Sequence, residues 1–160
     1  MKRNFGFTSA ERAVFQRLTT PAKIQRYVDD LAYDTGAGGD RCRSPRGVRQ
    51  EKRAQCVDGA LFGAAALRMI GYPPLLLDLE ADRDSDHVLA LYRQRGLWGS
   101  IAKSNYSGLR FREPAYRTLR ELVMSYFEHY FNLAREKTLR RYSRPVSLRR
   151  FDSRHLMTSD

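Results

Sequence analysis

The chain has 160 residues, of which 42% are hydrophobic, so it can bury one sizeable core and is too apolar to be disordered. Its 29 lysines and arginines against 18 aspartates and glutamates give a net charge of +11, which allows an acidic protein or a nucleic acid as partner. The sequence has no apolar run of membrane-spanning length, no apolar signal stretch at its start and too few cysteines for a disulfide framework. We therefore expect a cytoplasmic protein without a membrane association.

Two short amphipathic helices are predicted within residues 1–33. Thr8 and Glu11 form a capping-box pattern, in which the hydroxyl and the carboxylate each accept from the other's backbone N–H. The second helix starts at Thr20 and Pro21, because threonine is a favourable cap and proline suits the first helical position. Apolar residues then recur at helical spacing in both segments.

Residues 33–50 are rich in glycine and polar residues and are predicted to form a flexible loop. The glycines do not form a phosphate-binding loop, since no Gly-Lys-Ser/Thr follows them. Cys42 lies in this loop and is interpreted as incidental. A disulfide between Cys42 and Cys56 is the less favoured alternative in a cytoplasmic protein.

Residues 56–70 are apolar on nearly all sides, which predicts a buried helix that ends at Gly71. Its first residue is Cys56. A thiol at a helix N-terminus lies at the positive end of the helix dipole, which favours the nucleophilic thiolate. A small core residue is the plainer interpretation of a cysteine in such a place.

Three strands are predicted next, over residues 75–79, 87–92 and 97–102. The last two flank the turn residues Gln-Arg-Gly and form a hairpin. That pairing returns residues 102–105 to the level of His87, the first residue of its strand.

Glu113-Pro114 is predicted to open a long helix whose apolar face extends to Tyr130. Residues 135–160 are strongly basic, and two arginine pairs there could contact nucleic acid. The alternative is a segment that packs on the core through Leu148 and Phe151. Nucleic acid is the less favoured partner, because no aromatic platform or zinc-ligand spacing accompanies the charge.

Cys56 and His87 are the candidate nucleophile and base of a thiol enzyme, which also needs a group that orients the imidazole. Asn105 is the preferred orienting group and Ser104 the second choice, because both lie opposite His87 in the hairpin. The backbone N–H of Cys56 and the side chain of Gln55 are candidate oxyanion donors.

Other residues admit weaker roles. Trp98 is interpreted mainly as core packing and secondarily as a wall of a substrate groove. Asp78 is an alternative orienting group for His87, whereas Asp86 is poorly placed because it alternates to the other strand face. The three histidines are scattered and neither cysteine has zinc-ligand spacing, so we expect no metal and no cofactor.

An ordered series of segments resembles a bacterial branch of the transglutaminase-like superfamily. The resemblance covers most of the chain, from about residue 7 to about residue 151. The segments that carry it are Thr-Pro-Ala-Lys-Ile-Gln at 20–25, Arg-Ala-Gln-Cys-Val-Asp-Gly-Ala-Leu-Phe-Gly-Ala-Ala-Ala-Leu-Arg at 53–68, Pro-Leu-Leu-Leu-Asp-Leu at 74–79, Asp-His-Val at 86–88, Gly-Leu-Trp-Gly-Ser-Ile-Ala-Lys-Ser-Asn at 96–105, Leu-Arg-Phe-Arg-Glu-Pro at 109–114 and Ser-Tyr-Phe at 125–127.

The resemblance implies an α+β fold with a papain-like core, in which a central buried helix carrying the cysteine packs on a small antiparallel sheet flanked by helices. It implies one domain over residues 1–160, with N-terminal helices at 1–33, a core of the catalytic type at 51–134 and a basic extension at 135–160. Cys56 and His87 match the catalytic pair. Ala102-Lys103 stands where transglutaminases have their aspartate, a departure from the family pattern.

The sequence thus predicts two alternative functions. The first is thiol-dependent acyl transfer on a peptide or protein amide, by hydrolysis or by cross-linking, through Cys56, His87 and Asn105 or Ser104. The second is a catalytically inactive transglutaminase-like module whose basic surface binds an acidic protein or nucleic acid.

Overall fold

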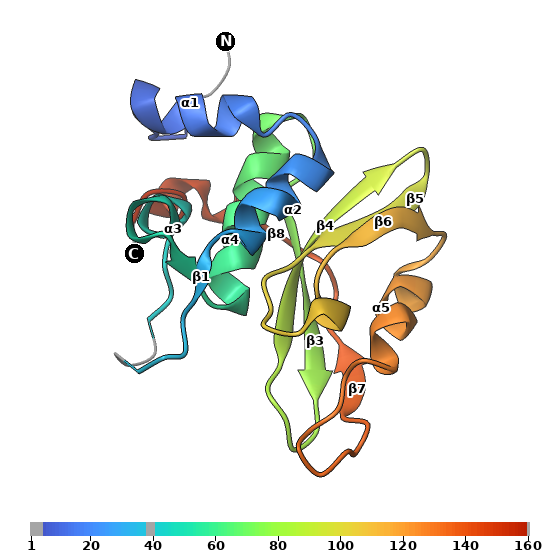
Figure 1. Cartoon of the computed structure of the whole chain (residues 1–160). Helices are drawn as coiled ribbons and strands as arrows, with labels where there is room; N and C mark the ends of the chain where they lie inside the picture. The colour runs from blue at the N-terminus through green and yellow to red at the C-terminus, as the bar shows by residue number, and fades with distance from the viewer. Residues whose placement is uncertain (1–4, 38–40, 160) are drawn as a thin grey trace.

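The computed structural model describes residues 5–37 and 41–159. These residues form a mixed α+β fold, as predicted, with helices on both faces of one antiparallel sheet (Figure 1). The α-helices are α1 (Ser9–Arg17), α2 (Pro21–Asp29), α3 (Pro45–Glu51), α4 (Cys56–Met69) and α5 (Leu119–Phe127). The strands are β1 (Ala32–Tyr33), β2 (Arg53–Ala54), β3 (Leu75–Ala81), β4 (His87–Gln94), β5 (Leu97–Ile101), β6 (Arg112–Tyr116), β7 (Leu139–Tyr142) and β8 (Val146–Ser147). Two 3₁₀ helices complete the described elements, η1 (Ser107–Leu109) and η2 (Leu148–Arg154).

The main sheet has the strand order β6-β5-β4-β3-β7, and β8 also pairs with β3. The predicted β4–β5 hairpin is confirmed, and its two turn residues, Arg95 and Gly96, both have positive φ angles, as a tight hairpin turn requires. Pairing between β4 and β5 runs inward from this turn and ends at Ala90 and Ile101. The first residues of β4 therefore pair with β3 on one side and have no β5 partner on the other.

The two faces of the sheet pack against different helices. Alternate β4 residues, including Ala90 and Tyr92, join the apolar cluster of α4 and the N-terminal helices. The intervening residues Leu89 and Leu91 join the cluster of α5. Figure 1 shows the same arrangement, with α4 between the N-terminal helices and the sheet, and α5 beyond the sheet.

Two of the predicted elements were wrong. Residues 33–50 contain helix α3, which Ser44 caps and Pro45 begins, so that the segment is not simply a loop. Glu113 and Pro114 lie in strand β6 and do not open a helix. β6 is the outer strand of the sheet, where a proline without an N–H is tolerated.

The basic C-terminal segment is part of the core. β7 and β8 pair with β3, Leu148 is buried in the α4 cluster, and Phe151 packs against it. The predicted packing through Leu148 and Phe151 is therefore confirmed. Within residues 5–37 and 41–159, no helix combines the length and the apolar character needed to cross a membrane.

Candidate functional site

Cys56 is the first residue of α4 and is half-buried. Its Sγ lies 4.0 Å from the backbone oxygen of Asp86, and the backbone N–H of Val88 donates to it. Asp86 and Val88 flank His87 in the chain. Because β5 has no pairing with this end of β4, the thiol occupies the open strand edge immediately beside His87.

His87 is the first residue of β4 and is 5% exposed. Its Nε2 lies 2.8 Å from the backbone oxygen of Leu109. A carbonyl oxygen only accepts hydrogen bonds, so Nε2 carries the proton and Nδ1 is the basic nitrogen of the neutral ring. The ring lies near that of Tyr126, with centroids 6.5 Å apart, and so faces the α5 side of the sheet.

The structure brings the thiol to the backbone around His87 but does not join it to the imidazole. α4 packs on one face of β4, and the ring of His87 is on the other. Among the described residues, no hydrogen bond connects Cys56 Sγ with a ring nitrogen of His87. Cys56 and His87 are therefore neighbours at the edge of β4, but no hydrogen bond joins their side chains in the described part of the chain.

Neither predicted orienting residue contacts the imidazole by a hydrogen bond in the described part of the chain. Asn105 is exposed, and the hydroxyl of Ser104 accepts the N–H of Tyr106 at 3.0 Å. The backbone oxygen of Leu109 takes the place expected for them. Every residue has a backbone carbonyl, so the Leu109 acceptor could not be identified from the residue types in the sequence.

Lys103 connects the segment that follows β5 with the end of α2. Its buried ammonium donates to the backbone oxygens of Val28, at 3.0 Å, and of Leu31, at the end of α2. The lysine therefore adds a donor at the C-terminal end of α2, where the Val28 oxygen also accepts the N–H of Leu31 at 3.4 Å. A Cβ on Gly59 of α4 would overlap the Cβ of Lys103, so glycine there allows the close approach.

The electrostatics of the two side chains favour their neutral forms. Burial raises the pKa of the Cys56 thiol above its usual value, and the carboxylates of Asp58 and Asp78 act in the same direction. The N–H groups of Val88 and Val57 oppose this shift only in part. Burial likewise lowers the pKa of His87. The surroundings of the thiol therefore do not add to the helix dipole in favouring a thiolate, because burial is the largest influence on the pKa of Cys56 and acts in the opposite direction.

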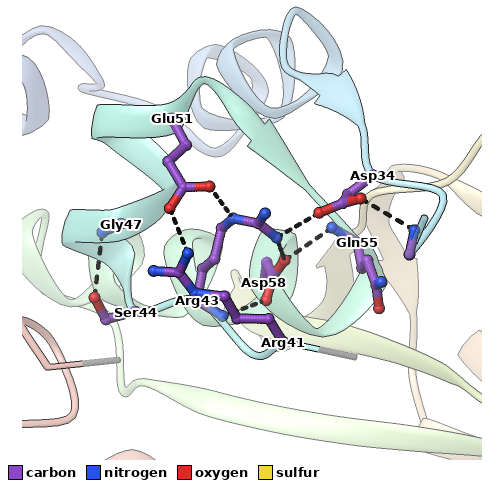
Figure 2. Close-up of polar contacts among 9 residues, drawn as sticks. Asp34, Arg41, Arg43, Ser44, Gly47, Glu51, Gln55 and Asp58 are labelled. Carbon is purple, nitrogen blue, oxygen red and sulfur yellow. Dashed lines mark hydrogen bonds and ion pairs between the residues drawn. The ribbon is translucent and has the colours of Figure 1, made fainter. Parts of the chain in front are cut away.

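A buried cluster of charges fixes the start of α4 (Figure 2). The guanidinium of Arg43 lies 2.6 Å from Asp34, 2.7 Å from Glu51 and 3.3 Å from Asp58. Asp58 is fully buried and also accepts the backbone N–H groups of Arg43 and Gln55. The sequence did not indicate this cluster, because its members come from a segment interpreted as a loop and from an apolar helix.

The remaining candidates differ in how close they lie to the thiol. Gln55 directly precedes Cys56, and its backbone N–H donates a hydrogen bond to the carboxylate of Asp58. Trp98 pairs with Arg93, six residues along β4 from His87 and thus roughly 20 Å away, too far to wall a groove at Cys56. Asp78 pairs with Val88 on the α4 side, so it does not orient His87.

Cys42 and Cys56 are not joined by a disulfide bond. No group of three or more histidine, cysteine, aspartate or glutamate side chains within the described ranges could hold a metal ion. No family model matches this chain, and no curated protein matches it. Function must therefore be inferred from the chain's own residues.

Proposed function

We propose that this chain is a transglutaminase-like protein with a papain-like core that transfers acyl groups through Cys56. The observation that carries the proposal is the position of the thiol. It lies against the backbone on both sides of His87, whose Nε2 is held by the carbonyl of Leu109. The cysteine at the start of a buried helix on an antiparallel sheet supports the same assignment.

The neutral pair indicates general-base activation and not a preformed ion pair. As Sγ attacks an amide carbonyl, the thiol proton passes to His87 Nδ1 and the C–S bond forms. The imidazolium then donates that proton to the leaving nitrogen as the C–N bond breaks. Water attacks the thioester and gives a proton to Nδ1, which returns it to the departing sulfur. Because the ring of His87 lies on the α5 side of β4, the proposal requires its side chain to turn toward Sγ at the open strand edge when substrate binds.

The oxyanion that forms during attack needs donors. The backbone N–H of Cys56 is one, because N–H groups of the first helical turn have no acceptor within the helix. The side-chain amide of Gln55 is the second, since Gln55 directly precedes the thiol at the start of α4. Leu109 assumes the orienting role first assigned to Asn105 or Ser104.

The test is acylation of Cys56 by an activated ester, followed by mass spectrometry of the labelled peptides. We expect His87→Asn to slow Cys56 acylation by about 100-fold or more, the usual contribution of general-base catalysis. Cys42, an exposed thiol in the same molecule, is the matched control, and its acylation should not change. If Cys56 is acylated at the same rate in the unchanged protein and in His87→Asn, the proposal is refuted.

A second function is favoured by the raised pKa of Cys56 and by the structural use of Lys103 where transglutaminases have aspartate. In this alternative the chain is an inactive module that binds an acidic protein through its net charge of +11. Binding to an acidic polypeptide should then weaken with salt and survive Cys56→Ala unchanged. Loss of binding in that variant would count against the module.

A further inference from the structure

The side chain of Arg112 connects strand β6 with helix α5 and with η1. Its Nε donates to the Ser125 hydroxyl at 2.9 Å, and a terminal nitrogen donates to the backbone oxygens of Gly108, at 2.7 Å, and Ser125, at 3.0 Å. The central carbon of the guanidinium lies 3.9 Å from the centre of the Tyr126 ring. No carboxylate within residues 5–37 and 41–159 forms an ion pair with Arg112, so its positive charge is not neutralised locally.

The Gly108 carbonyl lies one residue before the group that holds His87. Leu109 follows Gly108 in η1, and the Leu109 oxygen lies 2.8 Å from His87 Nε2. Gly108 is also fixed from a second direction, because a Cβ at this position would lie 2.5 Å from Cγ of the His129 ring. Glycine allows that ring to pack against the backbone. The segment that presents the Leu109 carbonyl is therefore held between Arg112 and His129.

Arg112 also acts on the charge of the imidazole. Burial lowers the pKa of His87, and the positive charge of Arg112 acts in the same direction, whereas the backbone hydrogen bond opposes both. Burial raises the pKa of Tyr126 to about 12 and raises that of the Cys56 thiol, so both neighbours are neutral at pH 7. The Asp86 carboxylate accepts a backbone N–H of β3 at 2.8 Å. Removal of the Arg112 charge should therefore raise the pKa of His87.

We propose that Arg112 is a positioning residue for the reaction at Cys56, which holds the Leu109 carbonyl where it keeps the proton of the neutral His87 ring on Nε2. The ring then starts its turn toward Sγ with Nδ1 unprotonated and able to accept the thiol proton. A displaced carbonyl would admit the other tautomer, with the proton on Nδ1, and a base in the wrong tautomer loses most of its effect. This inference rests on the proposed function.

Two measurements on the full chain test the role of Arg112. Long-range ¹H–¹⁵N NMR spectra report which nitrogen of His87 carries the proton and, over a range of pH, the pKa of the ring. The rate of Cys56 acylation by the activated ester is measured over the same range.

Arg112→Gln is neutral and shorter, so it should raise the pKa of His87 and reduce the share of the ring that is protonated on Nε2. Since the base must be neutral, acylation should then fall at a higher pH than in the unchanged protein. At pH 7 it should be slower by about tenfold or more, because misplacing a catalytic group by 1 Å can cost roughly 100-fold.

Two further variants separate the charge of Arg112 from its hydrogen bonds. Arg112→Lys keeps the charge but cannot form the same set of bonds, so the pKa of His87 should stay low while the Nε2 tautomer is partly lost and acylation slows. Arg93→Gln is the matched control, because Arg93 also lies over an aromatic ring, 5.5 Å from the centre of Trp98, and donates to the Gly96 carbonyl. It lies at the far end of β4 from His87 and should change neither measurement.

The NMR result and the acylation rate can fail separately. If the tautomer and the pKa of His87 are the same in the unchanged protein and in folded Arg112→Gln, Arg112 does not position the ring and the inference is overturned. If Arg112→Gln does not fold, an unchanged tautomer and an unchanged rate in Arg112→Lys overturn it equally. If the His87 signals change as expected but His87→Asn leaves the acylation of Cys56 unchanged, the proposed function is refuted, whereas the hold of Arg112 on the ring is supported.

Discussion

The two helices that cover opposite faces of the sheet begin in different ways. The first turn of α4 is held by Asp58, a fully buried carboxylate that accepts N–H groups from Arg43 and Gln55. The first turn of α5 is held by the exposed hydroxyl of Thr118, which accepts the N–H of Glu121 at 3.1 Å. The start of α4 thus depends on a residue 15 positions away, whereas that of α5 depends on its immediate neighbours.

This difference matters because α4 carries the thiol. A buried ion cluster fixes the helix start through several partners, so the position of Cys56 against β4 depends on the loop that supplies Arg43. A single exposed cap contributes less and acts only locally. The α4 start should therefore be sensitive to distant substitutions and the α5 start insensitive to them.

The largest expected effect is that of Asp58→Ala. It leaves the buried Arg43 guanidinium with one partner fewer and two backbone N–H groups without acceptors. Breaking a buried charge pair in this way costs about 3–5 kcal/mol of unfolding free energy. Urea denaturation measures it. Glu136→Ala, which breaks an exposed pair with Arg83, is the control and should cost about 0–1 kcal/mol. Similar losses in both variants would mean that the cluster does not hold the helix.

On the α5 face, His87→Leu removes the donor to the Leu109 carbonyl. A buried carbonyl left unpaired costs about 1–3 kcal/mol, which the same denaturation experiment would detect at pH 7. A change near zero would mean that water or another donor replaces the imidazole.

The pH dependence separates this effect from simple loss of packing. Burial lowers the pKa of His87 in the folded chain below its ordinary value of 6.5, so between these two values the unfolded chain binds more protons. Stability should therefore fall as the pH drops through about 6.5 and level off below the folded pKa. The His87→Leu variant should lack this component. Parallel pH profiles for the two proteins would contradict the neutral, buried state of the ring.

Gly59→Ala tests the contact between α4 and Lys103. The added Cβ would meet the Lys103 stem and force the helix and the end of β5 apart, at a cost of about 1–3 kcal/mol. Gly63→Ala, one turn further along α4, is the matched control. Its Cβ would approach the Ile101 Cγ2 at 3.0 Å, a milder contact with the end of a side chain, and should cost less. If Gly63→Ala loses more unfolding free energy than Gly59→Ala, the Lys103 stem moves aside to admit the added Cβ.

Features that depend on neighbouring residues could be predicted from the sequence. The Thr8 and Glu11 capping box, the helix from Cys56 and the β4–β5 hairpin are formed as expected, because each depends on residues close together in the chain. The Thr118 cap was missed although it is equally local, because Glu113-Pro114 was interpreted as an earlier helix start.

The site was less predictable than the elements. Local patterns located Cys56 and His87 on their helix and strand, but the face to which the ring turns depends on the register of β4 against β3 and β5. The Leu109 carbonyl is a backbone group, and the partners of Arg43 converge only in three dimensions. Each of these determines the chemistry near the thiol, and none has a signature in residue type or spacing.

The smallest expected effect is that of Thr118→Ala. It removes one exposed cap and leaves the N–H of Glu121 to water, so the unfolding free energy should fall by about 1 kcal/mol. Thr118→Ser keeps a hydroxyl and should restore most of that loss. Because α5 starts through local contacts, neither variant should change the rate at which Cys56 is alkylated, whereas Asp58→Ala should. If Thr118→Ala alters that rate, the two faces of the sheet are coupled and the contrast between the two helix starts does not hold.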